Sequence, residues 1–109
     1  MATDPDFLAL LHEQLAGLPV RTRAMFGGHV MWFDDKPVAV ITGDTLHLKR
    51  SDADPALFTG TTLRPAYDGA KPSHAVPRAL VHDAEWLVRA VTATAEALPA
   101  PKKRGGARG

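Results

Sequence analysis

Cysteine is absent from this 109-residue sequence. Its absence excludes disulfides, thiolate metal ligands, iron–sulfur clusters and thiol nucleophiles, so hydrophobic burial has to stabilise the fold. Long apolar runs are also missing, because no stretch approaches the roughly 18 residues that a transmembrane helix needs. The first residues lack the basic region, apolar stretch and small-residue cleavage site of a secretory signal. We therefore expect a soluble cytoplasmic protein with no membrane partner.

An excess of charge of one sign is missing too, since 13 basic and 12 acidic residues give a net charge of +1. Four basic residues lie near the C-terminus, at Lys102, Lys103, Arg104 and Arg108, so residues 1–101 carry nine basic and 12 acidic groups, a net charge of −3. A mildly acidic body argues against a large phosphate-binding face. With 45% hydrophobic residues, the chain fits one domain, expected at residues 1–98, and a disordered Pro/Lys/Arg/Gly tail at 99–109.

Apolar residues recur at helical spacing near both ends of the chain. The first helix is predicted at residues 4–16, with Thr3 as its N-cap, because large apolar side chains return every three or four positions. A short middle helix is expected after Ser51 or Asp52, either of which can cap it. The last helix follows Asp83 as its cap and carries a stripe of apolar residues.

Period-two alternation fills the segment between the first two helices and predicts three or four antiparallel strands. We expect strands at residues 20–26, 29–33, 38–42 and 46–49, with an edge strand at 62–64. Turn residues separate the first four at Gly27-Gly28, Asp34-Asp35-Lys36 and Gly43-Asp44. The fold class is therefore α+β: an antiparallel β-meander sheet flanked by an N-terminal helix, a short middle helix and a C-terminal helix.

Three further expectations concern exposure. The unbroken apolar run at 38–42 predicts a central strand covered on both faces. The alternation Leu46-His47-Leu48-Lys49 predicts one apolar face and one solvated face. Residues 68–77 contain Gly69, Pro72 and Pro77 and are predicted to form a surface loop.

Several motifs occur in a characteristic order. They are Met25-Phe26-Gly27-Gly28, the aliphatic strand ending at Ile41, Leu46-His47-Leu48-Lys49, Phe58, Val76-Pro77, and Trp86 in an alanine-rich last helix. In this order and spacing the chain resembles the amino-terminal domain of the TfoX/Sxy family, from about Arg21 to Leu98. The family motif maps onto Met25, Phe26, Gly27, Gly28, Leu48, Lys49, Pro77 and Trp86, in structural or interaction roles.

The resemblance implies an α+β domain with no known enzymatic activity, in a family whose members include regulators of natural competence that work beside the cyclic-AMP receptor protein. It also implies a standalone short member, because the sequence ends where the carboxy-terminal domain of longer members would begin. Where many relatives carry tyrosine and a glycine-rich stretch, this chain has Lys-Pro-Ser-His-Ala at residues 71–75. A short member could keep only a protein-binding function.

Residues able to carry chemistry do not form a recognisable pattern. None of the five histidines pairs with another at the spacing of a zinc-binding helix. His29 and His47 could meet across neighbouring strands, but two imidazoles are fewer than the ligands of a catalytic zinc. Solvated histidines are the better account. Ser51 and Ser73 are the only serines, and neither lies in a nucleophile motif. Asp34-Asp35 fits a turn better than a carboxylate pair. We therefore expect no catalytic residue, no cofactor and no metal.

Three functional hypotheses remain. The leading one is a non-enzymatic domain that acts by protein–protein contact in transcriptional or competence regulation, as the family motifs and the lack of an active-site pattern suggest. The large apolar residues at 31–33 alternate between both faces of the sheet, so one face could bind a protein partner or a second copy of the chain. The second is weak nucleic-acid binding through Arg21 and Arg23 together with the basic tail. The third is a small-ligand site or unrecognised enzyme with a pocket around Trp32, His29 and residues 68–77.

Overall fold

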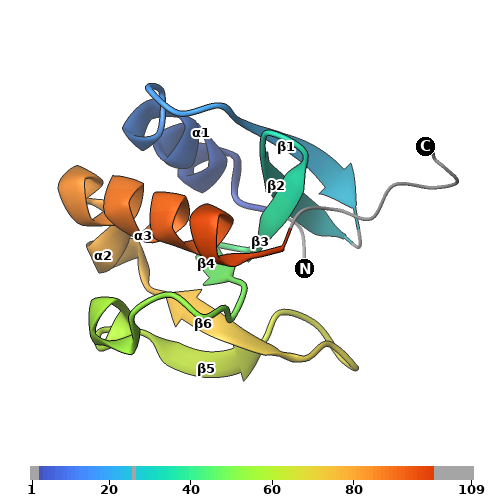
Figure 1. The fold of residues 1–109 in the computed structure, drawn as a ribbon. Helices are drawn as coiled ribbons and strands as arrows, with labels where there is room; N and C mark the ends of the chain where they lie inside the picture. Colours follow the sequence, from blue (N-terminus) through green and yellow to red (C-terminus); the bar gives the residue numbers. More distant parts are fainter. Residues whose placement is uncertain (1–2, 26, 100–109) are drawn as a thin grey trace, which may run out of the picture.

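The computed structural model describes residues 3–25 and 27–99. These residues form one six-stranded sheet and three α-helices, with a short 3-10 helix between the fourth and fifth strands (Figure 1). The elements in chain order are α1 (Pro5–Gln14), β1 (Val20–Met25), β2 (Gly28–Phe33), β3 (Lys36–Thr42), β4 (Thr45–Leu48), η1 (Pro55–Phe58), β5 (Thr62–Pro65), β6 (Pro72–Val76), α2 (Arg78–Val81) and α3 (Ala84–Ala97). The predicted α+β class is confirmed.

The first four strands form the predicted antiparallel meander, and the sheet order is β1-β2-β3-β4-β6-β5. The prediction of a loop over residues 68–77 was wrong, because Pro72–Val76 forms β6 between β4 and β5. Pro72 stands at the first position of this strand, where a missing N–H does little harm. The hairpin loop that remains lies between Pro65 and Pro72.

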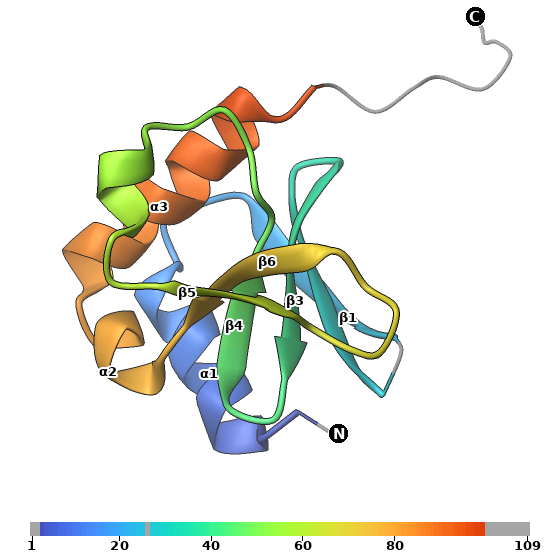
Figure 2. The same cartoon turned by 90° about the horizontal axis from the view of Figure 1, so that it is seen from below.

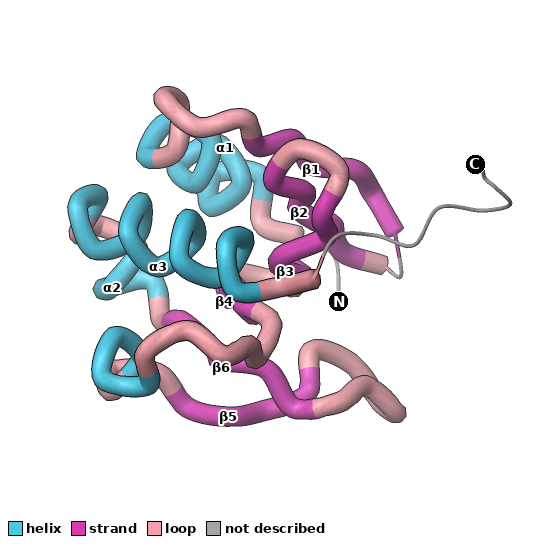
Figure 3. The backbone as a smooth tube through the Cα atoms, in the orientation of Figure 1, coloured by secondary structure: helices cyan, strands magenta, loops and turns pink. Residues whose placement is uncertain are grey.

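The helices lie together on one side of the sheet, as Figures 1 and 3 show. The core between the helices and the sheet contains fully buried side chains from both, including Phe7, Leu11, Leu87, Met31, Ile41, Leu46 and Leu48. Val38 and Ala39 are neighbours in β3 and both belong to this core, next to a shift in the β2–β3 register. Val40 and Thr42 are only half-buried, so the predicted cover of this strand on both faces is partial.

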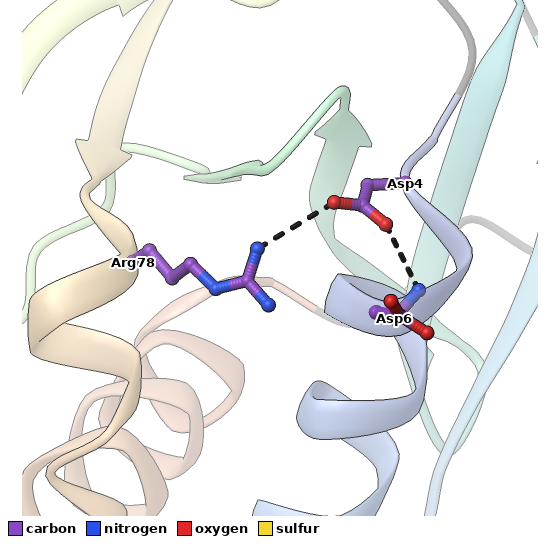
Figure 4. Close-up of polar contacts among 3 residues, drawn as sticks. All are labelled: Asp4, Asp6 and Arg78. Carbon is purple, nitrogen blue, oxygen red and sulfur yellow. Dashed lines mark hydrogen bonds and ion pairs between the residues drawn. The ribbon is translucent and has the colours of Figure 1, made fainter.

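Two of the three predicted helix caps differ from the observed ones, by one to three residues. Asp4, not Thr3, caps α1, because its carboxylate accepts the Asp6 N–H at 2.9 Å and lies 3.5 Å from the Arg78 guanidinium of α2 (Figure 4). Thr3 instead bridges to Gly43 next to β3. The middle helix is shorter than expected and has Asp54 as its cap. Pro55 follows this cap at the first helical position, where proline is favoured. Asp83 caps α3 as predicted.

Both predicted turns at the ends of β2 are present. Gly27 has φ 76°, a left-handed conformation that glycine adopts without strain, and Asp34 takes φ 55° in the Asp34-Asp35 turn. Lys36 follows this turn and donates from Nζ to the carbonyl oxygens of Ala95 and Leu98, at 2.7 and 2.9 Å. A cation at the C-terminal end of α3 complements the helix dipole and ties the helix to the sheet. Within the described residues, every helix is too short or too polar to cross a membrane.

Candidate functional site

The family motif residues that the structure describes are spread over the molecule and do not converge on one pocket. Leu48 is buried in the core, and Pro77 precedes α2 at its N-cap position. Trp86 lies on α3 and its Nε1–H donates to the Leu57 carbonyl oxygen at 2.9 Å, which fastens the 3-10 helix to α3. Lys49 donates its backbone N–H to Val38 at 2.9 Å and leaves its side chain exposed.

The glycine pair at the start of β2 also has a packing role. A Cβ atom on Gly28 would overlap the carbonyl oxygen of Ile41 in β3 and lie 3.3 Å from Thr42 Cγ2. The motif therefore joins a left-handed turn at Gly27 to a close backbone approach at Gly28. Met25 precedes the pair and is 38% exposed, and Phe26 lies outside the described residues.

The sheet face opposite the helices is called here the outer face. Strand register aligns Arg23, Val30, Val40, His47 and Ala75 in one row across it. Residues opposite one another in antiparallel strands share a face, so this row marks the outer face from β1 to β6.

Arg21 and Arg23 are exposed on β1 and share the outer face. The Arg21 guanidinium lies 4.8 Å from the centre of the Trp32 ring, a cation–π arrangement that links β1 to β2. Met31 and Phe33 contact the core while Trp32 faces the other way, as alternation predicts. The four tail residues proposed as nucleic-acid contacts, Lys102, Lys103, Arg104 and Arg108, lie outside the described residues.

The expectation of solvated histidines is wrong for His47, whose side chain is only 4% exposed. Its Nε2 shares a hydrogen bond with Thr42 Oγ1 at 3.2 Å, and its Nδ1 has no hydrogen-bond partner among the described residues. Burial, with a smaller contribution from the positive charge of Arg64, lowers the pKa of His47 below its usual 6.5. Both effects favour the neutral imidazole.

His29 and His47 do not meet. Strand β3 separates their strands, and register puts His29 in line with Ile41 on the core side while His47 is in line with Val40 on the outer face. His74 is stacked on Phe58 with ring centres 4.4 Å apart, and burial followed by the charge of Arg50 lowers its pKa. Within residues 3–25 and 27–99, no group of three or more histidine and carboxylate side chains is arranged to hold a metal ion.

Two adjoining hollows are present on the outer face, beneath the β5–β6 hairpin. The first has a volume of about 470 Å³ and is lined by Val40, His47, Lys49, Arg50, Lys71 and Pro72, among others. The second, of about 680 Å³, shares His47, Ala66 and Tyr67 with the first. Figures 1 and 2 show the loop of this hairpin projecting away from the helices.

Neither Trp32 nor His29, the residues predicted to surround a pocket, lines these two hollows, and strand register puts them on opposite faces of the sheet. His29 lies on the other side of the sheet, where its Nδ1 is 2.8 Å from Thr3 Oγ1, and Trp32 is engaged with Arg21 at the β1 end. Of the residues predicted to surround a ligand pocket, residues 70–73 line the first hollow.

The fold defines a small α+β domain with a meander sheet, in which several motif residues make structural contacts. Its sequence matches the model of the TfoX N-terminal domain family over residues 13–98, and the chain belongs to this family. It is a competence-regulator-like domain. It is also 34% identical over 105 residues to a protein of Spirochaeta aurantia named as an uncharacterized 12.7 kDa protein in the trpE 5′ region. That match covers 95% of this chain and 90% of the relative.

Proposed function

We propose that the chain is a non-enzymatic regulatory domain that acts by binding another protein, in transcriptional or competence regulation. Membership of the TfoX N-terminal family supports the regulatory setting. The observation that carries the binding role is the exposed surface of β1, where Arg21, Arg23 and Met25 follow one another along one face and the Arg21 guanidinium lies over the Trp32 ring. These three residues with Trp32 are called the β1 surface below.

The composition of the β1 surface is that of an interface. Arginine, methionine and aromatic residues are enriched where proteins meet, and lysine and glutamate are depleted. The stacking of Arg21 on Trp32 pre-orders two long side chains, which reduces the entropy lost when a partner docks. Strand β1 also stands at the end of the sheet order, so among the described strands one of its edges has no neighbour. An extended segment of a partner could pair there.

The test is a charge reversal on the β1 surface. The doubly substituted chain Arg21→Glu/Arg23→Glu is compared with wild type as bait in native cell lysate, with and without nuclease. Both arginines are exposed, so the variant is expected to fold. A defined protein that wild type retains after nuclease treatment, and that the variant loses, supports the proposal.

The matched control is Arg89→Glu, which reverses an exposed charge on α3, on the side of the molecule opposite the outer face. It should retain the partner. Equal capture by all three baits would remove the β1 surface from consideration. Sedimentation of the purified chain at high concentration tells a second copy of the same chain from a foreign partner.

A second candidate is weak nucleic-acid binding, favoured by the placement of Arg21 and Arg23 on one exposed face. With the basic residues of the tail, these arginines would release counterions from phosphates, so binding should weaken steeply as salt rises. Binding to a DNA fragment that is constant across salt concentrations, or unchanged in Arg21→Glu/Arg23→Glu, would contradict this electrostatic basis.

A further inference from the structure

The first hollow on the outer face concentrates positive charge. Lys49, Arg50 and Lys71 line it, and no aspartate or glutamate is among its lining residues in the described part of the chain. This is the reverse of the overall balance, because residues 1–101 carry three more acidic than basic groups. The three cations come from two segments, the end of β4 and the start of β6, which the sheet brings together. Their repulsion is relieved if an anion lies between them.

The wall of the hollow is partly apolar. Val40 from β3 and Pro72 from β6 line it together with the cations. A volume of about 470 Å³ is within the range of sites that hold small organic molecules. Apolar walls with a few convergent polar groups favour an organic anion over a bare inorganic one, because the walls can bury its carbon skeleton.

His47 lies where the two hollows meet. Its imidazole is nine-tenths or more buried and keeps an Nδ1 atom without a hydrogen-bond partner among the described residues. A buried polar atom without a partner costs free energy unless a further group satisfies it. The charged and titratable groups lining the two hollows around it are Arg64, Lys49, Arg50, Lys71, Tyr67, Asp44 and Asp68.

We propose that the first hollow is a binding site for a small organic anion, a carboxylate or phosphate ester whose charged group lies among Lys49, Arg50 and Lys71 and whose apolar body lies against Val40 and Pro72. None of these residues belongs to the β1 surface. The site is therefore separate from the proposed protein interface, and either can fail without the other.

The experiment is a titration of the full-length ¹⁵N-labelled chain followed by NMR. Three anionic probes are added separately to about 10 mM, well above a millimolar dissociation constant: benzoate, adenosine 5′-monophosphate and 8-anilinonaphthalene-1-sulfonate. Adenosine is the neutral control. At least one anionic probe should shift the His47 imidazole signals and the backbone amides of residues 66–71 and 73 in a saturable way, whereas adenosine should not.

The variant is Lys49→Gln/Lys71→Gln, which removes two exposed charges and leaves the buried His47 in place. We expect its affinity for the bound probe to fall by about tenfold or more. Arg89→Gln, with one exposed charge removed from α3, should bind as wild type does. The bound anion should also raise the pKa of His47, because it opposes the charge of Arg64.

Three results would overturn the proposal. One is that none of the three anionic probes perturbs these signals up to the highest concentration. Another is that adenosine perturbs them as strongly as its monophosphate while benzoate and the sulfonate have no effect. The third is unchanged affinity in Lys49→Gln/Lys71→Gln, which would place the bound anion elsewhere.

Discussion

Substitution of Gly28 by alanine tests the physical basis of the Gly-Gly motif. The added Cβ would overlap the carbonyl oxygen of Ile41 and lie 3.3 Å from both the Ile41 carbonyl carbon and Thr42 Cγ2. The obstructing oxygen belongs to the backbone of a central strand, so it cannot rotate away as a side chain could. Strands β2 and β3 would have to separate locally to admit one methyl group.

The cost follows from two contributions. Overpacking of a well-packed region destabilises by about 1–3 kcal/mol. Loosening of the β2–β3 ladder beside the His29–Ile41 pair removes about one further hydrogen bond, worth roughly 1 kcal/mol. We expect Gly28→Ala to lower the free energy of unfolding by about 3 kcal/mol. For a chain of this length, that corresponds to a Tm about 13 °C lower.

Circular dichroism during heating, with urea unfolding at a fixed temperature, measures both quantities. The matched control is Gly17→Ala, since a Cβ at Gly17 meets nothing within 4 Å. This control should stay within about 0.5 kcal/mol of wild type. A Gly28→Ala protein that melts within about 2 °C of wild type would refute the close-approach account of the motif.

Three further outcomes are expected. Lys36→Met should lower the free energy of unfolding by about 1–2 kcal/mol, because two carbonyl oxygens at the end of α3 lose a charged donor; urea unfolding equal to wild type would contradict this. Trp86→Phe should cost about 1 kcal/mol through the lost bond to Leu57, with Trp86→Leu costing more because the ring is also lost. Burial lowers the pKa values of His47 and His74 in the folded state, so just below pH 6.5 the unfolded state binds more protons than the folded state. The free energy of unfolding should therefore fall as the pH drops through 6.5. Urea midpoints that stay constant or rise on acidification would contradict this sign.

The meander could be predicted because its signals are local. Alternation and turn residues lie within a few positions of each other, and β1 to β4 fall close to the predicted ranges. Strand β6 could not be found in this way, because two prolines bracket it and its stability comes from pairing with β4, about 30 residues earlier, and with β5. The cap at Asp4 was missed because Thr3 has an equivalent side-chain oxygen, and the choice between them depends on the bridge from Thr3 to Gly43.

The candidate site shows the same limit. Alternation in Leu46-His47-Leu48-Lys49 assigns the correct side to each residue, since both leucines are buried in the core and His47 lies on the outer face. Alternation says nothing about what covers that face. The β5–β6 hairpin returns over His47 from residues 64–73, and the same return brings Lys71 to the side of Lys49 and Arg50. Burial of the imidazole and convergence of the cations therefore share one cause. A substitution that displaces this hairpin should expose His47, return its pKa toward 6.5 and weaken anion binding together.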